Sequence, residues 1–567
     1  MKHYLVYIFL FFYTGVWAQP FFETLHYPKS FISPVHFPIQ LVGNFGECRP
    51  NHFHSGLDIR TNSQENKKIY AIESGFVSRI KIEPGGFGNA IYITHTNGFT
   101  SVYAHLNRFF PALENFVRRN QYASKSWQQD IYLAPHQFPI QKDDFIAWSG
   151  NTGSSQGPHL HMEIRNTKTE APLNGLLFYP SLADTKAPIL KQLAIYDATQ
   201  SIYEQSPILY SLSKQNNTYQ PATKNIEVTS QKIYFGIQAD DVMDQSTGKL
   251  GVYELSLYVD DKPYFAWRMN DISYDITRYM NALADYKTKK SKNTWIQLCH
   301  QLPNDQLTVY KSLQKNKGIV SLELDKPCKI KIVAKDTKNN SSIAEFFVST
   351  KNISNKATCE EQINAGKAYT YKSKLIEFES DADAFYDYVC FKANTKESNL
   401  PYSYLYQLHY DFVPLHTAAT IRLTPKAPIP ENLKSKIAIA KLSVSEKEKY
   451  SKGMAATIEH GKAVAKIKEL GNYEIVIDQT APSISTTLKN NTNISKMKRL
   501  YFTIKEDITD VSTFEASVDG QWLRLVRKGN TFFYELDDYF PTGTHVLTIQ
   551  ASDQNNNTSL KTFKLIR

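Results

Sequence analysis

Three short fragments in the first third of the chain place histidine, aspartate and glycine at spacings that suit catalysis. They span residues 52–58, 103–106 and 149–163. A single His-x-His pair is weak evidence in a chain with 15 histidines, because such a pair arises easily by chance. The conjunction of all three fragments is far less expected by chance, and it indicates one site.

The spacing within the fragments favours a metal centre. His159 and His161 are two residues apart in a run that reads as a strand, so both imidazoles leave the same face of that strand. His54 and Asp58 flank Gly56, which permits a bend that brings both side chains to one centre. Two imidazole nitrogens and one carboxylate oxygen are typical of catalytic zinc, whose fourth position holds a water. Zinc acidifies this water and polarises a carbonyl, while two further histidines would move the proton and stabilise the oxyanion.

A β domain must position these fragments. Between residues 41 and 164, short apolar runs alternate with glycine-rich turns such as Gly85-Gly86. Tight turns of this kind join antiparallel strands, so we predict an antiparallel β domain. Residues 107–142 form a longer excursion, in which Pro111–Tyr122 is expected to be a short helix that begins at its proline.

The three fragments, in this order, resemble the M23 zinc metallopeptidases, which are cell-wall endopeptidases of the lysostaphin/LytM type. Their motifs are H-x-G-x-D, Y-A-H-L and G-N-T-G-x-S-x-G-P-H-L-H-M-E-I-R, and the resemblance covers about residues 41–180. The longer form of the first motif, from Gly46 to Asp58, is similar to the branch found in Bacteroidota. The resemblance implies an antiparallel β LytM/M23 domain and one bound Zn²⁺ ion.

The resemblance also implies a role for each motif residue. It implies that His54, Asp58 and His161 bind the zinc ion. His105 and His159 match the two catalytic histidines of the family. Either one can be the general base while the other stabilises the tetrahedral intermediate, and the sequence leaves both assignments open.

Three further residues lie beside these motifs, and we expect them to face the substrate: His52, Tyr103 and Asn151. His52 forms a second His-x-His pair with His54, so direct metal binding by His52 is the alternative. The excursion at residues 107–142 is longer than the usual connection in this family, and we expect it to form part of the wall of the substrate groove.

The remainder of the chain carries two internal echoes, which mark repeated units. One echo reads D-x-x-A-P and the other reads A-x-D-x-x-N-N-[ST]-S. The first motif, D-x-x-A-P, occurs at residues 184–188 and 478–482. The second motif occurs at residues 334–342 and 551–559. Proline starts the first strand after a linker, and turns rich in Asp and Asn close a last hairpin. Such units look like immunoglobulin-like sandwiches of bacterial proteins.

The fold class predicted for the whole chain is therefore mainly β, with several domains. After a signal peptide at residues 1–18, we predict an M23 peptidase domain at residues 19–183, an immunoglobulin-like β-sandwich module at 184–350, a β-rich module at 351–477 and a C-terminal immunoglobulin-like module at 478–567.

The first residues indicate export, which bears on the state of the cysteines. Met1-Lys2, an apolar run and Ala18 form the pattern of a cleaved signal peptide, with an uncleaved anchor as the alternative. We therefore expect a periplasmic or extracellular protein of the cell envelope, where disulfides persist. Five cysteines remain, and the odd number leaves at least one free or paired between chains. Cys299–Cys328 and Cys359–Cys390 are the pairs nearest in sequence, and five buried thiols are the alternative.

Composition excludes several classes of partner. The formal net charge of +10 is spread over 567 residues without a basic stripe, so nucleic-acid binding is not expected. No internal run of about 18 apolar residues occurs, so we expect no integral membrane span after signal cleavage.

Together these observations predict an exported zinc-dependent endopeptidase that hydrolyses peptide cross-links of peptidoglycan. Its partners would be peptidoglycan stem peptides and, through the C-terminal β modules, an envelope protein. In a Gram-negative envelope, the resemblance implies hydrolysis between D-Ala and meso-diaminopimelate. The alternative is a catalytically silent M23-like envelope scaffold, regulator or adhesin that uses the β modules for binding.

Overall fold

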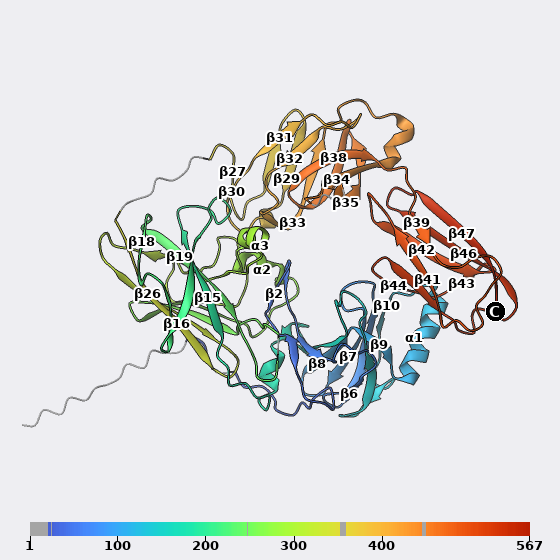
Figure 1. The fold of residues 1–567 in the computed structure, drawn as a ribbon, viewed down its shortest axis with the longest axis horizontal. Helices are drawn as coiled ribbons and strands as arrows, with labels where there is room; N and C mark the ends of the chain where they lie inside the picture. The colour runs from blue at the N-terminus through green and yellow to red at the C-terminus, as the bar shows by residue number, and fades with distance from the viewer. Residues whose placement is uncertain (1–20, 24, 247, 352–358, 445–448) are drawn as a thin grey trace, which may run out of the picture.

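The computed structural model describes residues 21–23, 25–246, 248–351, 359–444 and 449–567. Strands dominate these residues, and the chain passes through four sets of packed sheets that form a ring (Figure 1). The mainly β fold class is confirmed. The predicted signal peptide at residues 1–18 lies outside the described residues. Within the described ranges, no helix is long and apolar enough to cross a membrane.

Two sheets form the first domain. The large sheet has the order β1 (Leu41–Gly43), β4 (Leu57–Arg60), β13 (His159–Asn166), β8 (Phe99–Ala104), β7 (Asn89–His95), β6 (Gly75–Ile82) and β10 (Gln129–Tyr132). The small sheet is β5 (Lys68–Tyr70), β12 (Phe145–Ser149) and β9 (Leu106–Phe109). Side chains alternate between the faces of a strand, so each sheet contributes an apolar row to one shared core, which includes Ile69, Ile146 and Leu160. Short strands β2 (Cys48–Arg49) and β3 (His52–Phe53) pair with each other, and β14 (Pro172–Leu173) pairs with β13.

The excursion at residues 107–142 adds an edge to the large sheet. Helix α1 (Pro111–Ser124) begins at its proline, as predicted, and ends before Lys125, which has a left-handed backbone. Strands β10 and β11 (Pro139–Ile140) then pair with β6. This edge is opposite to β1 and β4. The excursion was expected to form part of the wall of a groove; the structure places its strands at this outer edge and α1 against the C-terminal sheets.

The second set of sheets lies on the left of Figure 1, and its strands share one core through residues such as Leu193, Phe235, Leu257 and Phe346. Its strands are β15 (Ile189–Asp197), β16 (Ile208–Gln215), β17 (Thr218–Pro221), β18 (Asn225–Val228), β19 (Lys232–Asp240), β20 (Glu254–Val259), β21 (Lys262–Arg268), β22 (Gln297–Leu298), β23 (Tyr310–Ser312), β24 (Val320–Ser321), β25 (Cys328–Lys335) and β26 (Ser341–Thr350). Two short helices, α2 (Met280–Leu283) and α3 (Tyr286–Lys292), follow β21.

The third set consists of two five-stranded sheets, whose apolar rows meet at residues such as Phe378, Ile421, Tyr406 and Ile475. One sheet contains β28 (Tyr369–Lys372), β29 (Ile376–Ser380), β33 (Pro414–Leu423), β37 (Lys462–Glu469) and β36 (Thr457–Glu459). The other contains β31 (Ala393–Lys396), β32 (Leu405–Leu408), β38 (Gly471–Ile477), β34 (Ile437–Leu442) and β35 (Tyr450–Ala455). A separate pair is β27 (Gln362–Ile363) with β30 (Val389–Cys390).

The C-terminal set is again two packed sheets, with Phe502 and Tyr534 of one facing Ile549 of the other in a common core. The first sheet contains β39 (Ser483–Ser485), β41 (Arg499–Lys505), β45 (Thr531–Glu535) and β44 (Leu525–Lys528). The second contains β40 (Thr492–Asn493), β47 (Thr558–Ile566), β46 (Thr544–Asp553), β42 (Val511–Val518) and β43 (Gln521–Trp522).

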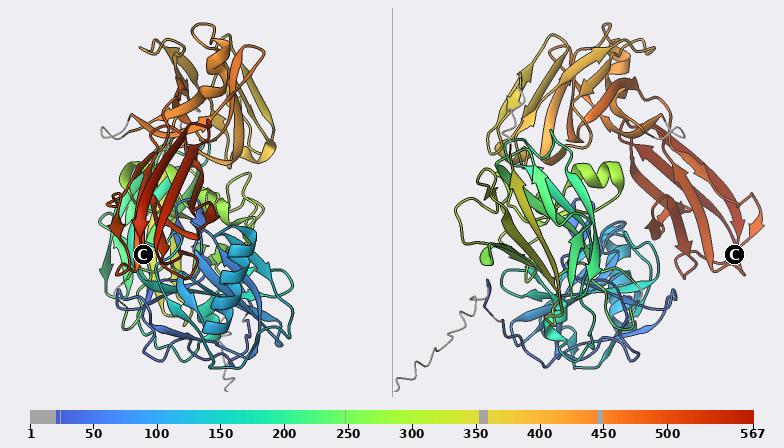
Figure 2. Two further views of the ribbon diagram at one scale, coloured as in Figure 1. Left: turned by 90° about the vertical axis from the view of Figure 1, so that its right-hand side faces the viewer. Right: turned by 60° about the vertical axis from the view of Figure 1, so that its left-hand side comes forward.

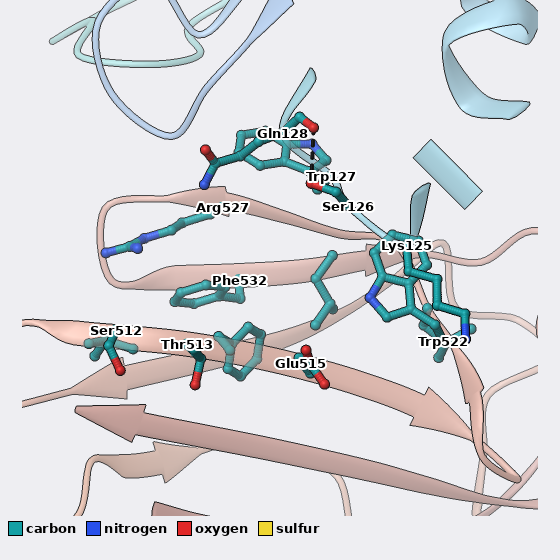
Figure 3. A pocket seen from close by; sticks show the side chains of 14 residues that line it. Lys125, Ser126, Trp127, Gln128, Ser512, Thr513, Glu515, Trp522, Arg527 and Phe532 are labelled. Atoms are coloured by element: carbon teal, nitrogen blue, oxygen red, sulfur yellow. Dashed lines mark hydrogen bonds between the residues drawn. The ribbon is translucent and has the colours of Figure 1, made fainter. Parts of the chain in front are cut away.

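The C-terminal sheets return to helix α1 and close the ring (Figures 1 and 2). Tyr122 of α1 stacks on Tyr539, with ring centroids 3.4 Å apart, and meets the edge of Trp522. Its hydroxyl donates to Asp537 at 2.8 Å. Figure 3 shows the neighbouring loop, where Trp127 faces side chains of the C-terminal sheets. A contact between residues 415 positions apart thus joins the first domain to the C-terminal sheets.

We expect Tyr122→Ala to open this ring. Tyr122 is half-buried, and truncating an aromatic anchor at an interface costs about 2 kcal/mol, which is roughly a 30-fold shift toward the open form. Small-angle X-ray scattering should then report a larger radius of gyration. Tyr122→Phe is the matched control, since it keeps the stacked ring and removes only the hydroxyl. An unchanged scattering curve for Tyr122→Ala would contradict a closure held by this residue.

The structure joins one of the two cysteine pairs nearest in sequence. Cys359 and Cys390 form a disulfide. Cys299 and Cys328 are both free, and so is the buried Cys48. Cys299 directly follows β22, which pairs with β19. Cys328 is the first residue of β25, which pairs with β26. The proposed Cys299–Cys328 pair is therefore wrong, because the two residues belong to different parts of the sheet.

Candidate metal centre

Three side chains converge where β4 and β13 meet. His161 of β13 lies opposite Asp58 of β4 in the antiparallel register. His54 comes from the turn between β3 and β4, where Gly56 packs so closely on the backbone of Met162 that a side chain would not fit. All three side chains are buried, with at most 4% of each residue exposed.

The three ligand atoms form a nearly equilateral triangle. His54 Nε2 lies 3.0 Å from Asp58 Oδ1 and 3.0 Å from His161 Nδ1, and the last two atoms are 2.9 Å apart. A point about 2.1 Å from all three atoms lies above this triangle, and zinc binds imidazole nitrogen and carboxylate oxygen at roughly 2.0–2.2 Å. The donor set and its geometry therefore fit a metal ion, and these are the three residues that the sequence predicted as ligands.

Neighbouring groups hold each of these side chains in place. The Nδ1 of His54 lies 2.8 Å from the carbonyl oxygen of Asn44, so it carries the proton and leaves Nε2 free as an acceptor. Arg49 donates to Asp58 Oδ2 at 2.7 Å, which leaves Oδ1 facing the triangle. On the other side of the centre, His161 Nε2 lies 3.1 Å from the carboxylate of Glu163. Such partners orient metal ligands and tune their basicity.

Glu163 links the centre to the second set of sheets. Its carboxylate is 1% exposed and accepts hydrogen bonds from Arg165, Ser55 and Tyr274, the last at 2.5 Å. Tyr274 follows β21, more than a hundred residues along the chain from Glu163. Burial raises the pKa of Glu163, but Arg165 and His161 outweigh this effect and lower the pKa to about 2. Glu163 is therefore ionised when it orients His161.

We expect Glu163→Gln to weaken metal binding by about 10–100-fold, the range typical of lost orienting partners. The neutral amide removes the negative charge that holds the His161 ring with Nδ1 toward the triangle. Competition with a chromophoric chelator measures the change in zinc affinity. Glu170→Gln is the matched control. The carboxylate of Glu170 is exposed and lies 3.5 Å from Arg165, the arginine that also contacts Glu163. Equal zinc affinity in both variants would contradict this role of Glu163.

Two further histidines lie beside the triangle. His159 Nε2 is 3.3 Å from Asp58 Oδ1, and it has no hydrogen-bond partner among the described residues. The ring of His105 is centred 4.8 Å from that of His159 and 5.7 Å from that of His161. His105 has a left-handed backbone with φ of 57°, a conformation that costs energy in a residue other than glycine. The turn after β8 thus holds this side chain toward the centre.

Each of the two histidines is anchored through Nδ1. His159 Nδ1 lies 2.8 Å from the carbonyl oxygen of Gly157, and His105 Nδ1 lies 2.9 Å from that of Thr152. A carbonyl only accepts, so both Nδ1 atoms carry a proton, and in the neutral imidazole it is Nε2 that has the free lone pair. Burial, together with the neighbouring histidines, lowers the pKa of His105 to about 3. His105 is consequently a neutral base at physiological pH.

Acid–base properties of the ligands also suit a cation. Burial lowers the pKa of His54. Burial opposes the charged form of His161 as well, but its hydrogen bonds to Asp58 and Glu163 outweigh this and raise the pKa to about 9. The His161 ring is thus surrounded by negative charge. A bound metal ion takes the place of that proton, since metal binding requires the neutral imidazole.

The structure separates the three residues expected to face the substrate. His52 is exposed beside the centre, with Nδ1 2.9 Å from the carbonyl oxygen of Pro50. It lies outside the ligand triangle. Asn151 is half-buried, and its carbonyl oxygen accepts a hydrogen bond from Lys528 of the C-terminal sheets. Tyr103, by contrast, is fully buried in the core, where its hydroxyl accepts from the Ile72 amide at 2.9 Å.

The prediction that Tyr103 faces the substrate is therefore wrong. Successive residues of a strand point to opposite faces, and Tyr103 points with Ser101 toward the core between the two sheets. Ala104 and Val102, on the other face, pack with Tyr92. Tyr103 therefore supports the strand that carries His105 and does not contact a substrate.

Sequence reasoning missed the residues that orient the ligands. Arg49 lies within the longer first motif, and Glu163 and Arg165 follow the His-x-His pair directly. Because these charged residues lie close in sequence to the predicted ligands, they could have been predicted as partners that orient them. Tyr274 carried no such signal, because only the folded chain brings it to Glu163.

Comparisons with known proteins match two parts of the chain. The model of "Peptidase family M23" matches residues 52–136, and that of a "Zu5-like domain" matches residues 360–478. The DD-carboxypeptidase/endopeptidase Mpg of Neisseria meningitidis serogroup B is 29% identical over 162 residues, which are 28% of this chain and 31% of that protein. An uncharacterized metalloprotease of Haemophilus influenzae is 29% identical over 129 residues, which are 23% of this chain and 21% of that protein. The chain thus spans about a third or less of the length of these relatives.

Two solved structures each align with about a quarter of the chain. The catalytic domain of the prophage-encoded M23 protein EnpA from Enterococcus faecalis is 21% identical and covers 23% of this chain and 85% of its own, with a TM-score of 0.17. The catalytic domain of lysostaphin from Staphylococcus simulans is 22% identical and covers 24% of this chain and 87% of its own, also with a TM-score of 0.17.

Proposed function

Because its first domain is an M23-family peptidase domain, we propose that this protein is an exported zinc endopeptidase that hydrolyses peptide cross-links of peptidoglycan. The observation that carries the proposal is the triangle of His54, Asp58 and His161, with the free Nε2 of His159 3.3 Å from Asp58 Oδ1. All five residues of the expected machinery lie in one cluster, in which four are buried and His159 is partly exposed. The Mpg relative, named a DD-carboxypeptidase/endopeptidase, supports a cell-wall peptide as the substrate.

The residues around the centre divide the work of hydrolysis. His54 Nε2, Asp58 Oδ1 and His161 Nδ1 would hold the zinc ion, which when bound supplies an acidified water and a Lewis acid for the scissile carbonyl. In the neutral imidazole, His159 and His105 each offer an Nε2 lone pair, so either one can accept the proton of the attacking water and then donate it to the leaving amine. The other histidine could stabilise the oxyanion only with a proton on its own Nε2. The free lone pair on both leaves the choice of base open.

Purified peptidoglycan tests this function and separates it from the scaffold alternative. The mature protein, starting at Gln19, is incubated with cross-linked sacculi, and soluble and insoluble fractions are analysed by mass spectrometry. An endopeptidase releases uncross-linked stem peptides with new amino and carboxyl termini. Co-sedimentation with the sacculi without any such product would instead favour a binding protein that uses its β modules. The mass of the products identifies the bond.

A further inference from the structure

The repeated sequence motifs after the first domain build a repeated side-chain cluster. In the first cluster, the Asp336 carboxylate accepts two hydrogen bonds from Asn340. The backbone amide of Asn340 donates at 2.9 Å and the side-chain amide of Asn340 donates at 2.6 Å. The same side-chain amide donates to the carbonyl oxygen of Asp184 at 3.0 Å. Ser342 donates to the carbonyl oxygen of Pro188. The linker D-x-x-A-P is thereby tied to the last hairpin of its set of sheets.

The second cluster repeats these bonds. Asp553 accepts from the backbone amide of Asn557 at 2.8 Å and from its side-chain amide at 2.7 Å. The side-chain amide again donates to the carbonyl oxygen of the linker aspartate, Asp478, at 2.9 Å. Ser559 donates to the carbonyl oxygen of Pro482. The two internal echoes are therefore one structural device that is used twice.

A third carboxylate joins each cluster at the same place in the fold. Asp241 directly follows β19, and Glu506 directly follows β41; each of these strands pairs with the first strand of its set. The strand pairing is also the same in both sets. Asp240, the last residue of β19, lies opposite Ile189, which is five positions after Asp184. Lys505, the last residue of β41, lies opposite Ser483, which is five positions after Asp478. Ligand atoms of Asp478, Glu506 and Asp553 all lie within 4.8 Å of one another, whereas those of Asp184, Asp241 and Asp336 are not grouped as tightly among the described residues. Asp336 and Asp184 are nevertheless the charged neighbours of Asp241. The sequence pattern gave no sign of this third member.

In the described part of the chain the carboxylates lack an ion-pair partner, although the ammonium of Lys338 is close enough to Asp184 and Asp336 to interact with their charge. Among the described residues, no lysine, arginine or histidine forms an ion pair with any of the six: Asp184, Asp241, Asp336, Asp478, Glu506 and Asp553. Asp241 is 4% exposed, and its buried Oδ1 has no hydrogen-bond partner in the described chain. The buried Oε2 of Glu506 is likewise unpartnered there. Leaving such oxygens unpaired is costly, so these atoms point to a missing ligand.

Electrostatics within the clusters support a positively charged ligand. Burial, and then the neighbouring Asp336 and Asp184, raise the pKa of Asp241 to about 8. Burial, and then the adjacent Asp507, raise the pKa of Glu506 to about 7. Like charges held together in this way require either a proton or a cation. The donor sets contain only oxygen, without His or Cys, which favours a hard cation over zinc.

We propose that the two clusters bind Ca²⁺, one ion at Asp184/Asp241/Asp336 and one at Asp478/Glu506/Asp553. Ca²⁺ takes six to eight oxygen ligands in flexible geometry, and waters complete the shell of three carboxylates. Each ion would sit where a linker enters a set of sheets, after the first domain and after β38. Its binding would fix the angle between neighbours and hence the shape of the ring.

Calcium binding to the full mature chain tests this proposal. The protein is treated to remove free divalent ions, loaded with zinc and titrated with CaCl₂ in a calorimeter. We expect two Ca²⁺ per chain and a higher melting temperature, with a weaker response to MgCl₂. Asp241→Asn and Glu506→Gln should each lose one of the two sites. Asp538→Asn, at an exposed residue of the C-terminal sheets, should keep both.

The variants also separate binding from simple charge repulsion. Without Ca²⁺, Asp241→Asn should be as stable as the parent or more stable, because it removes one of three crowded charges. With Ca²⁺, the parent should gain stability and the variant should gain less. Absence of Ca²⁺ binding by the parent protein at millimolar concentration would overturn the proposal, and so would two bound ions in both variants. The parent titration decides this even if a variant does not fold, and zinc content and hydrolysis play no part in it.

Discussion

His161→Ala is expected to lose zinc and, with it, all measurable hydrolysis. The substitution removes one corner of a triangle whose sides are 2.9–3.0 Å, and it leaves two ligands in place of three. Loss of a partner that merely orients a ligand costs 10–100-fold in metal affinity, so loss of the ligand itself should cost more than about 100-fold. Elemental analysis of the purified variant measures the zinc content directly.

His136→Ala is the matched control for this experiment, because His136 is an exposed histidine of the same domain. It should keep one zinc per chain and full activity. Asp58→Ala should behave like His161→Ala, since Asp58 Oδ1 is the corner shared by both imidazoles. Stoichiometric zinc in either ligand variant would show that the metal is held elsewhere.

His159→Ala should keep zinc and lose turnover. The ring of His159 lies beside the triangle and is not one of its corners, so the metal affinity stays within a few-fold of the parent value. Its free Nε2 is positioned for proton transfer or for the oxyanion, and loss of a general acid–base group typically lowers the rate by about 10²–10⁴-fold. Steady-state kinetics on a soluble cross-linked peptide, with zinc content measured in parallel, separates the two effects.

His52→Ala serves as the comparison for His159→Ala. His52 is exposed and lies outside the triangle, so its loss should affect binding of the substrate more than turnover. An increase in KM with little change in kcat is the expected pattern. Full hydrolysis by His159→Ala, with zinc retained, would refute the catalytic role assigned to this histidine.

Local periodicity explains why much of the centre could be predicted from the sequence. In a strand, residues two apart share a face, and His159 and His161 indeed approach the same oxygen of Asp58, at 3.3 and 2.9 Å. Gly56 marked the bend that brings His54 to Asp58. The helix at Pro111 was also readable, because proline suits the first helical position.

Contacts between distant segments could not be predicted in the same way. Tyr274 reaches Glu163 only because the second set of sheets packs on the first domain. Tyr122 meets Asp537 only when the ring closes. Tyr103 was misassigned for a related reason: its place beside a catalytic motif says nothing about which face of β8 it occupies, and burial in the core decides that.

Zinc reconstitution tests most directly whether one zinc ion held by His54, Asp58 and His161 drives hydrolysis. The mature protein is stripped with a zinc-selective chelator, and zinc is added back in fractional equivalents while stem-peptide release from purified peptidoglycan is followed by mass spectrometry. We expect no release without zinc, a rate that rises in proportion to added zinc and a plateau at one equivalent. Release that persists in the stripped protein, or no release with one zinc bound, would contradict this role of zinc.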